Sequence, residues 1–253
     1  MSKYILSDLL QLMAHLRSPD HGCPWALKQT NQTTLPYTLE EVYEVADAID
    51  SGDTRALQLE LGDLLFQVVF YAQLAKEEQA FDFNEVVSSI TEKLLRRHPH
   101  VFPEGTLESA GSVKIDANEQ QIRENWQRIK EQERAEAGSK PAKLTDTVPQ
   151  ALPALMRAGK LQQVAAGAGF DWPDVNGVWE KLDEEIAELK RAVSGGRTAE
   201  ILDEVGDLLF TCVNLARHLQ VSPESALRAA NLKFEARLGC VEASVAAQNK
   251  DMK

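Results

Sequence analysis

An internal repeat limits the folds open to this chain more than any other feature of its sequence. Residues 40–66 align with residues 184–210 without a gap, at a constant offset of 144 positions. Identical residues occupy 12 of the 27 aligned positions, whereas chance gives about one or two. A chain of 253 residues has room for two copies of one unit. We therefore predict a tandem duplication, with an N-terminal domain over 1–136, a linker over 137–149 and a C-terminal domain over 150–253.

Helical periodicity runs through most of the chain, because apolar residues recur at intervals of three and four. No stretch alternates polar and apolar residues as a half-buried strand does. The pattern predicts helices over about 4–16, 38–50, 54–77, 82–99, 119–136, 153–166, 178–194, 198–220 and 223–246. Thr38 is the predicted N-cap of the second helix, and Pro99 ends the fourth because proline cannot continue a helix. Residues 101–118 are expected to form a loop, and the predicted fold class is all-α.

Composition excludes several classes of function. Hydrophobic residues make up 43% of the chain and charged residues 26%, which is typical of a globular protein. A net charge of −12 argues against a nucleic acid as the partner, and the absence of a run of about 20 apolar residues argues against a membrane span. The N-terminus lacks the pattern of a secretory signal, and the three cysteines suggest no disulfide framework. We therefore expect a protein of the reducing cytoplasm.

The acidic residues of each copy are arranged symmetrically about a glycine turn. Glu44 and Glu60 each lie eight residues from Gly52, and Glu41 and Asp63 each lie eleven residues from it. In an antiparallel helix hairpin, residues equidistant from the turn lie at about the same height, and acids spaced i, i+3 share a face. The corresponding residues of the second copy, arranged about Gly196, are Glu185, Glu188, Glu204 and Asp207.

Four carboxylates on one inner face need a counter-charge. Two like charges about 4 Å apart repel by roughly 4 kcal/mol at an effective dielectric constant near 20. Ligation by oxygen alone suits Mg²⁺ or Mn²⁺. A di-iron centre is disfavoured, because it needs a Glu-x-x-His pattern that neither pair of helices has. The alternative is an ordinary solvated acidic face, and the symmetric, repeated arrangement favours the metal site over it.

Protein-bound Mg²⁺ often contacts a substrate phosphate, so cationic and aromatic residues are candidates for substrate binding. The chain has no GxxxxGK[ST] phosphate loop. Three pairs at i, i+4 spacing are Lys93 with Arg97, Lys233 with Arg237, and Trp126 with Lys130. Tyr37 and Lys181 lie one turn before Glu41 and Glu185, where they could face the same pocket. Charges that stabilise helix ends, and a tryptophan in the core, are the alternative interpretations.

The motifs Glu-Glu-x-x-Glu and Glu-x-Gly-Asp-Leu-Leu-Phe resemble those of the MazG family of nucleoside triphosphate pyrophosphohydrolases. The tandem duplication, Arg-His-Pro-His-Val-Phe at 97–102 and Gly-Phe-Asp-Trp at 169–172 extend the resemblance over nearly the whole chain. It implies tandem all-α helical-bundle domains and a homodimer. It also implies Mg²⁺-dependent cleavage of a nucleoside triphosphate to the monophosphate and pyrophosphate, through attack of water on the α-phosphorus.

The resemblance also implies roles for individual residues. The implied metal ligands are Glu41, Glu44, Glu60 and Asp63, and Glu185, Glu188, Glu204 and Asp207. The implied nucleotide contacts are Lys93, Arg97, Trp126 and Lys130 in the first unit, and Lys233 and Arg237 in the second. Only 16 residues follow Arg237 and none of them is tryptophan, which puts closure of the second site around substrate in doubt. Glu40 and Glu184, next to the ligand sets, are candidates for the general base, and a metal ligand is the alternative.

Two other functions stay open at this point. A non-catalytic sensor that binds Mg²⁺ and nucleotide would bind without forming product. A helical dimerisation or adaptor protein, in which the acids are only a solvated surface, would gain no thermal stability from Mg²⁺ and nucleotide. The paired acids argue against the adaptor. Neither the base preference nor the active half of the chain follows from the sequence.

Overall fold

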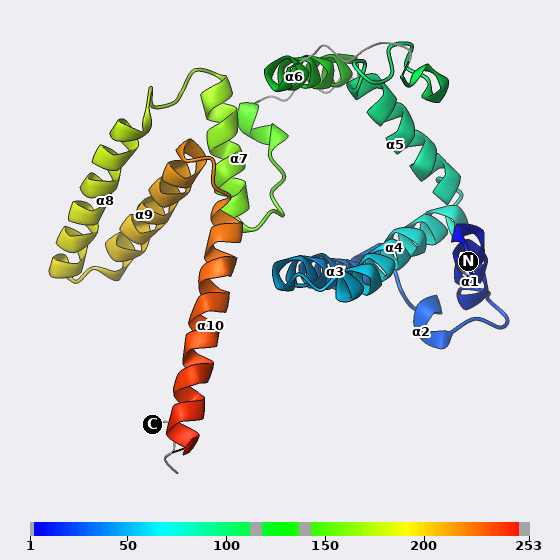
Figure 1. Ribbon diagram of the computed structural model, residues 1–253, viewed down its shortest axis with the longest axis horizontal. Coiled ribbons are helices and arrows are strands. Elements are labelled where there is room, and N and C mark those ends of the chain that lie inside the picture. Colours follow the sequence, from blue (N-terminus) through cyan, green and yellow to red (C-terminus); the bar gives the residue numbers. More distant parts are fainter. Residues whose placement is uncertain (1–2, 112–117, 137–142, 248–253) are drawn as a thin grey trace. The chain divides into compact units, whose positions relative to one another are not determined.

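The computed structural model describes residues 3–111, 118–136 and 143–247, and every regular element in these ranges is a helix (Figure 1). The predicted all-α class is thereby confirmed. Within the described ranges, no helix combines the length and the apolar character needed to cross a membrane. The chain divides into two compact units, Met1–Ser139 and Lys140–Lys253. The domain limits drawn from the sequence stay predictions.

The first unit is organised around one helix hairpin, α3 with α4. Its elements are α1 (Leu6–Leu16), α2 (Pro24–Leu27), α3 (Asn31–Ser51), α4 (Thr54–Glu77), α5 (Phe83–Arg97), the 3₁₀ helix η1 (Leu107–Ser109) and α6 (Glu119–Glu136). Helix α1 packs on α4, and α5 contacts both α4 and α6. Helices α1 and α5 thus pack on the α4 side of the hairpin, and α6 packs on α5.

The hairpin turn has a clear local cause. Gly52 adopts a left-handed conformation with φ 71°, which ends α3 at little steric cost because glycine has no Cβ. Asp53 then caps α4, since its Oδ1 accepts hydrogen bonds from the backbone N–H groups of Arg55 and Ala56 at 2.9 and 3.0 Å. A turn this short fixes the register of the two helices, and therefore the heights of their acidic residues.

Helix α3 begins earlier than its sequence pattern predicts. The prediction of Thr38 as its N-cap is wrong, because Thr30 caps the helix and exchanges hydrogen bonds with Thr33 in a capping box. Pro36 lies inside the helix, where proline normally disfavours helical structure. The Thr38 hydroxyl lies 2.9 Å from the Tyr71 hydroxyl of α4, and this contact ties the early turns of α3 to the hairpin.

The second unit repeats the hairpin as α8 with α9. Its elements are the 3₁₀ helix η2 (Leu144–Thr147), α7 (Ala154–Gly167), α8 (Val175–Gly195), α9 (Thr198–His218) and α10 (Pro223–Ala247). Gly196 has φ 70°, so its turn has the same conformation as that at Gly52. Helix α7 packs on α9 and η2, and α10 contacts α7 and α9. Within the predicted linker, Leu144–Thr147 form η2 and Val148 is buried, while residues 137–142 lie outside the described part of the chain.

Candidate active site

The hairpin of the first unit brings three carboxylates together. Glu41, Glu60 and Asp63 each place an oxygen within 4.8 Å of the others. Burial raises the pKa of Glu41, a hydrogen bond from Gln67 opposes this rise, and repulsion by Asp63 and Glu44 adds to it. All four predicted acids of this copy therefore lie in one neighbourhood, with Glu44 beside the group of three.

The second hairpin gathers a corresponding set. Glu185, Glu188 and Glu204 each place an oxygen within 4.8 Å of the others. Desolvation raises the pKa of Glu204, and repulsion by Glu188, Glu185 and Asp207 raises it further. The predicted pairing of acids at equal heights about the turn agrees with this geometry, although the closest three differ between the copies. Asp63 belongs to the first group, whereas its counterpart Asp207 lies beside the second.

Glu185 is the most buried of these acids, with 4% of its surface exposed. Its Oε1 accepts a hydrogen bond from Lys181 Nζ at 2.9 Å, and the same amine lies 3.0 Å from Glu184 Oε1. Hydrogen bonds to Glu185 and Glu184 raise the pKa of Lys181, so its amine stays charged. Glu185 Oε2 is buried and has no hydrogen-bond partner. An unsatisfied buried oxygen costs free energy that a bound cation would recover.

The donor chemistry of this cluster suits a hard divalent cation. Every donor is a carboxylate oxygen. The three negative charges of Glu185, Glu188 and Glu204 are opposed by two cations, Lys181 at Glu185 and Arg191, which lies 3.1 Å from Glu188. Together with the unpartnered oxygen of Glu185, this arrangement fits a metal ion held between α8 and α9.

A cavity of about 760 Å³ adjoins the acids of the second unit. Its charged lining residues are Lys181, Glu185, Asp207, Asp171 and Arg217. Its aromatic lining residues are Phe170, Trp172 and Phe210, and the others are Thr145, Leu161, Gln162, Ala165, Gly169, Thr211 and Asn214. This volume lies within the usual range of small-molecule sites, which are largely apolar with a few polar groups.

The cationic and aromatic candidates of the first unit meet between α5 and α6. The guanidinium of Arg97 lies 5.3 Å from the centre of the Trp126 ring, and Lys130 Nζ lies 5.5 Å from the same ring. Arg97 also forms an ion pair with Glu133 at 2.6 Å, a partner that the sequence did not indicate. Lys93 lies on α5 with its side chain exposed. The structure therefore brings three of the four candidates together.

The remaining candidates are Glu40, Tyr37, Lys233 and Arg237. Glu40 is exposed on α3, and Tyr37 packs edge-to-face on Trp25 with ring centres 5.8 Å apart. Lys233 and Arg237 are exposed on α10 and do not line the cavity of their own unit. Their predicted contacts with nucleotide stay predictions.

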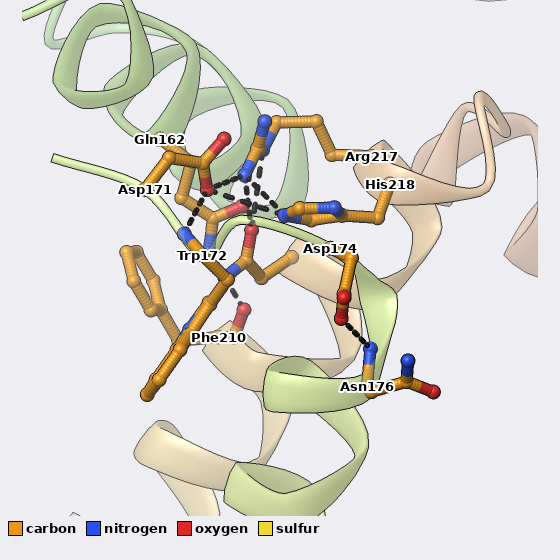
Figure 2. Close-up of polar contacts among 9 residues, drawn as sticks. Gln162, Asp171, Trp172, Asp174, Asn176, Phe210, Arg217 and His218 are labelled. Carbon is orange, nitrogen blue, oxygen red and sulfur yellow. Dashed lines mark hydrogen bonds and ion pairs between the residues drawn. The ribbon is translucent and has the colours of Figure 1, made fainter. Parts of the chain in front are cut away.

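A polar cluster beside the cavity was not foreseen (Figure 2). Arg217 and His218, at the end of α9, both contact the carboxylate of Asp171. Burial tends to raise the pKa of Asp171, but hydrogen bonds from Arg217 and His218 outweigh burial and hold it below its usual value. The Gly-Phe-Asp-Trp motif marked Asp171, yet its partners lie 46 and 47 positions further along the chain. No local pattern could have identified them.

Gln162 of α7 is a second unforeseen residue on the cavity wall. Its Nε2 donates a hydrogen bond to the backbone oxygen of Phe210 at 2.8 Å (Figure 2). Its Oε1 is buried without a partner. Only the packing of α7 on α9 creates this contact, so the sequence carries no signal for it.

Fold and sites together define an all-α protein of two helical units, each with a carboxylate cluster between antiparallel helices. Residues 29–102 match the family model of the MazG nucleotide pyrophosphohydrolase domain. Residues 171–233 match the model of phosphoribosyl-ATP pyrophosphohydrolase. Each match covers the acidic hairpin of one unit.

Curated relatives extend the match to nearly the full chain. A nucleoside triphosphate pyrophosphohydrolase of Escherichia coli K12 is 49% identical over 98% of this chain and 90% of its own length. The nucleoside triphosphate pyrophosphohydrolase/pyrophosphatase MazG of Thermotoga maritima is 42% identical over 94% of this chain and 86% of its own length. The chain belongs to the MazG family of nucleotide pyrophosphohydrolases. The expected family, and with it the assignment as an enzyme, are confirmed.

Proposed function

We propose that this protein hydrolyses nucleoside triphosphates to nucleoside monophosphates and pyrophosphate, with Mg²⁺ or Mn²⁺ as the cofactor. The observation that carries the proposal is the carboxylate cluster that, with Lys181, adjoins the 760 Å³ cavity. The names of the E. coli and T. maritima relatives support the same reaction.

In the second unit, Glu185, Glu188, Glu204 and Asp207 would hold the metal, and Glu41, Glu44, Glu60 and Asp63 are the corresponding ligands in the first. A bound Mg²⁺ supplies charge neutralisation for the phosphates and lowers the pKa of a bound water. Lys181, held at 2.9 Å from Glu185, would bind a phosphate oxygen of the leaving pyrophosphate. Glu184 shares the amine of Lys181 at 3.0 Å, which orients its carboxylate beside the cluster. We assign it, and Glu40 in the first unit, as candidate general bases for the attacking water.

We place the principal hydrolytic site in the second unit, because its acidic cluster adjoins a cavity lined by both charged and aromatic residues. In the first unit, Lys93, Arg97, Trp126 and Lys130 are the proposed nucleotide contacts. Arg97 would have to exchange Glu133 for a phosphate before it could serve in this way.

Product analysis tests the reaction. We expect ATP, dCTP and UTP to give the monophosphate and pyrophosphate with Mg²⁺ and not with EDTA. In ¹⁸O-water the label should enter the monophosphate, because water attacks the α-phosphorus. Label in orthophosphate, or turnover that survives EDTA, would contradict the proposal. Metal-dependent binding without product would instead indicate a nucleotide sensor.

Single substitutions then assign the site. Glu185→Gln should abolish turnover while Glu41→Gln retains most of it, and the double variant should keep its helical content. The reverse result would move the hydrolytic site to the first unit. Unchanged pyrophosphate release by the double variant would refute the carboxylate mechanism.

We also propose that the protein forms a homodimer through the α3–α4 hairpin. Leu39, Val42, Leu61 and Leu65 are apolar residues of this hairpin, with 39–52% of their surfaces exposed. Exposed apolar rows on packed helices mark association surfaces. Light scattering coupled to gel filtration should give twice the chain mass of 28.1 kDa. Replacement of Leu61 and Leu65 by Glu should shift the protein to the monomer, and a wild-type monomer would refute the assignment.

A further inference from the structure

The loop between α7 and α8 places two aromatic side chains on the wall of the second unit's cavity. Phe170 and Trp172 both line the cavity, although 83% and 44% of their surfaces are exposed. Phe210 of α9 adds a third ring. Large apolar side chains gain free energy when a ligand covers them. Flat rings are especially suited to nucleobases. Every nucleobase can stack on an aromatic side chain, whatever hydrogen-bond donors and acceptors lie on its edge.

The loop is fastened to the end of α9 through Asp171, as Figure 2 shows. Asp171 Oδ1 accepts a hydrogen bond from Arg217 Nη2, lies 3.2 Å from His218 Nε2, and accepts the backbone N–H of Trp172 at 2.9 Å. Arg217 is held in turn by Asn214 Oδ1, which lies 2.7 Å from Nη2. The side chains of Arg217 and His218 are only 18% and 12% exposed, so this contact is less screened than a surface ion pair.

The Trp172 ring is also seated on the backbone of α8. A Cβ at Gly177 would lie 2.6 Å from Cε3 of the ring, closer than side-chain contacts allow. Glycine inside a helix is less favourable than alanine by about 1 kcal/mol. The first turn of α8 therefore gives up helix stability at a position where only glycine leaves room for the indole.

Helix α8 also sets the distance between this ring and the metal site. Gly177, Lys181 and Glu185 follow one another at intervals of four residues, so they lie along one side of the helix. The eight residues from Gly177 to Glu185 span about 12 Å of helix axis. Along this side of the helix, an aromatic ring is followed by an amine and then by a carboxylate. A nucleotide likewise has its base at one end and its phosphates at the other.

We propose that Trp172 and its neighbouring rings form the nucleobase subsite of the second unit, and that Asp171 and Arg217 are positioning residues that hold this wall in place. The inference rests on the proposed hydrolysis of nucleotides and names where the base of that substrate binds. The subsite takes the base of a nucleoside mono- or triphosphate by stacking. Asp171 and Arg217 also line the cavity, and the role assigned to them is to hold the loop that carries Trp172.

Binding of AMP and of inorganic pyrophosphate separates the two parts of the site. The two products are titrated calorimetrically, with Mg²⁺, into the wild type and into Trp172→Ala. Loss of one stacking platform should weaken AMP binding about 5- to 150-fold and leave pyrophosphate binding within twofold. Trp179→Ala is the matched control, because Trp179 is an exposed tryptophan of α8 that does not line the cavity.

Variants of the loop contacts test the positioning role. Asp171→Ala should raise KM for ATP about 3- to 10-fold at nearly unchanged kcat, because the loop occupies its binding position for a smaller fraction of the time. Asp171→Asn should restore part of this loss, since its amide oxygen still accepts from Arg217. Gly177→Ala should weaken AMP binding because its Cβ displaces the Trp172 ring, and far-ultraviolet circular dichroism should show that the variant keeps its helical content.

These experiments distinguish failure of the nucleobase subsite from failure of the proposed hydrolysis. Trp172→Ala binding AMP as tightly as Trp179→Ala, or equal losses for AMP and pyrophosphate, would overturn the nucleobase subsite, as would a wild type that does not bind AMP. A rise in KM on Asp171→Ala with no rescue by Asp171→Asn would overturn the positioning role. A wild type that binds AMP through Trp172 but releases no pyrophosphate from ATP would refute the hydrolase and leave the subsite standing.

Discussion

Replacing Glu185 by glutamine should change the stability of the second unit little without metal, but should remove most of the stability that the unit gains from Mg²⁺. Without metal, two changes oppose each other. Carboxylate oxygens 4.8 Å apart, the limit for Glu185 and Glu188, repel by about 1 to 3.5 kcal/mol for dielectric constants between 80 and 20. The attraction of Lys181 at 2.9 Å is lost at the same time, and it is worth about 1.4 to 6 kcal/mol over the same range. The amide can still accept from Lys181, so we expect the free energy of unfolding in EDTA to change by less than about 1.5 kcal/mol.

With Mg²⁺, the free energies of unfolding of the wild type and of Glu185→Gln should differ. At a metal concentration 100 times the wild-type Kd, binding stabilises the wild type by about 2.7 kcal/mol. Removing a ligand carboxylate should weaken metal binding by more than about 100-fold. Even residues that only hydrogen-bond to metal ligands contribute about 10- to 100-fold to metal affinity. The variant would then gain about 0.4 kcal/mol or less at the same metal concentration.

The assay is urea unfolding followed by far-ultraviolet circular dichroism, with Mg²⁺ and with EDTA, alongside pyrophosphate release. Glu180→Gln is the control, because it removes an exposed carboxylate from the same helix but outside the cluster. It should behave as the wild type in both solutions. A Glu185→Gln protein that keeps the full Mg²⁺-dependent stabilisation, or turnover within tenfold of the wild type, would refute the reasoning.

Three further changes have defined outcomes. Asp53→Ala should cost about 1 kcal/mol of unfolding free energy in urea, because two backbone N–H groups of α4 lose their cap; an unchanged midpoint would show that the turn alone fixes the hairpin. Hydrogen bonds from Arg17 lower the pKa of Glu77, so this carboxylate stabilises the fold above its unfolded value of about 4.5 and loses that effect as the pH falls through its lower folded pKa. Glu77→Gln should therefore be less stable than the wild type at pH 7, and the difference should shrink in acid; a difference independent of pH would contradict this. Gln162→Leu should stay within about 1 kcal/mol of the wild type in urea, because it removes an orphaned buried oxygen together with one hydrogen bond; a loss of several kcal/mol would show that Oε1 has a partner in solution.

The hairpins were predictable because their determinants are local. Gly52, Asp53 and the apolar periodicity on either side specify two antiparallel helices, and counting from the turn then places Glu41 and Asp63 at the same height. The repeat gave the same result for the second unit. The gathering of acids at each hairpin therefore followed from the sequence, whereas which three lie closest together did not.

The first residue of α3 could not be predicted from the local sequence. Residues 31–37 include Pro36 and few strong helix formers, so local preference indicated a later start at Thr38. The helix forms earlier because Thr30 caps it and because Thr38 contacts Tyr71 of α4. Tertiary packing overrides propensity here, and a single sequence does not show that packing.

The walls of the cavity were beyond prediction for the same reason. Asp171 meets Arg217 only because the loop before α8 folds back onto the end of α9. Gln162 meets Phe210 only because α7 packs on α9. Each contact joins residues more than 40 positions apart, and their spacing has no signature comparable to that of the paired acids.

The matching turns at Gly52 and Gly196 bear on how two duplicated copies can diverge. The acidic residues of each cluster lie within a single hairpin, so a copy inherits them as one contiguous segment. Part of the cavity wall comes from α7 and the loop that follows it, outside the hairpin, whereas Phe210, Thr211, Asn214 and Arg217 of the wall belong to α9. Mutation of α7 and its loop can therefore reshape part of the wall of one copy without altering its acids, and a hairpin exchanged between the copies should carry the acids and Phe210 but not Trp172.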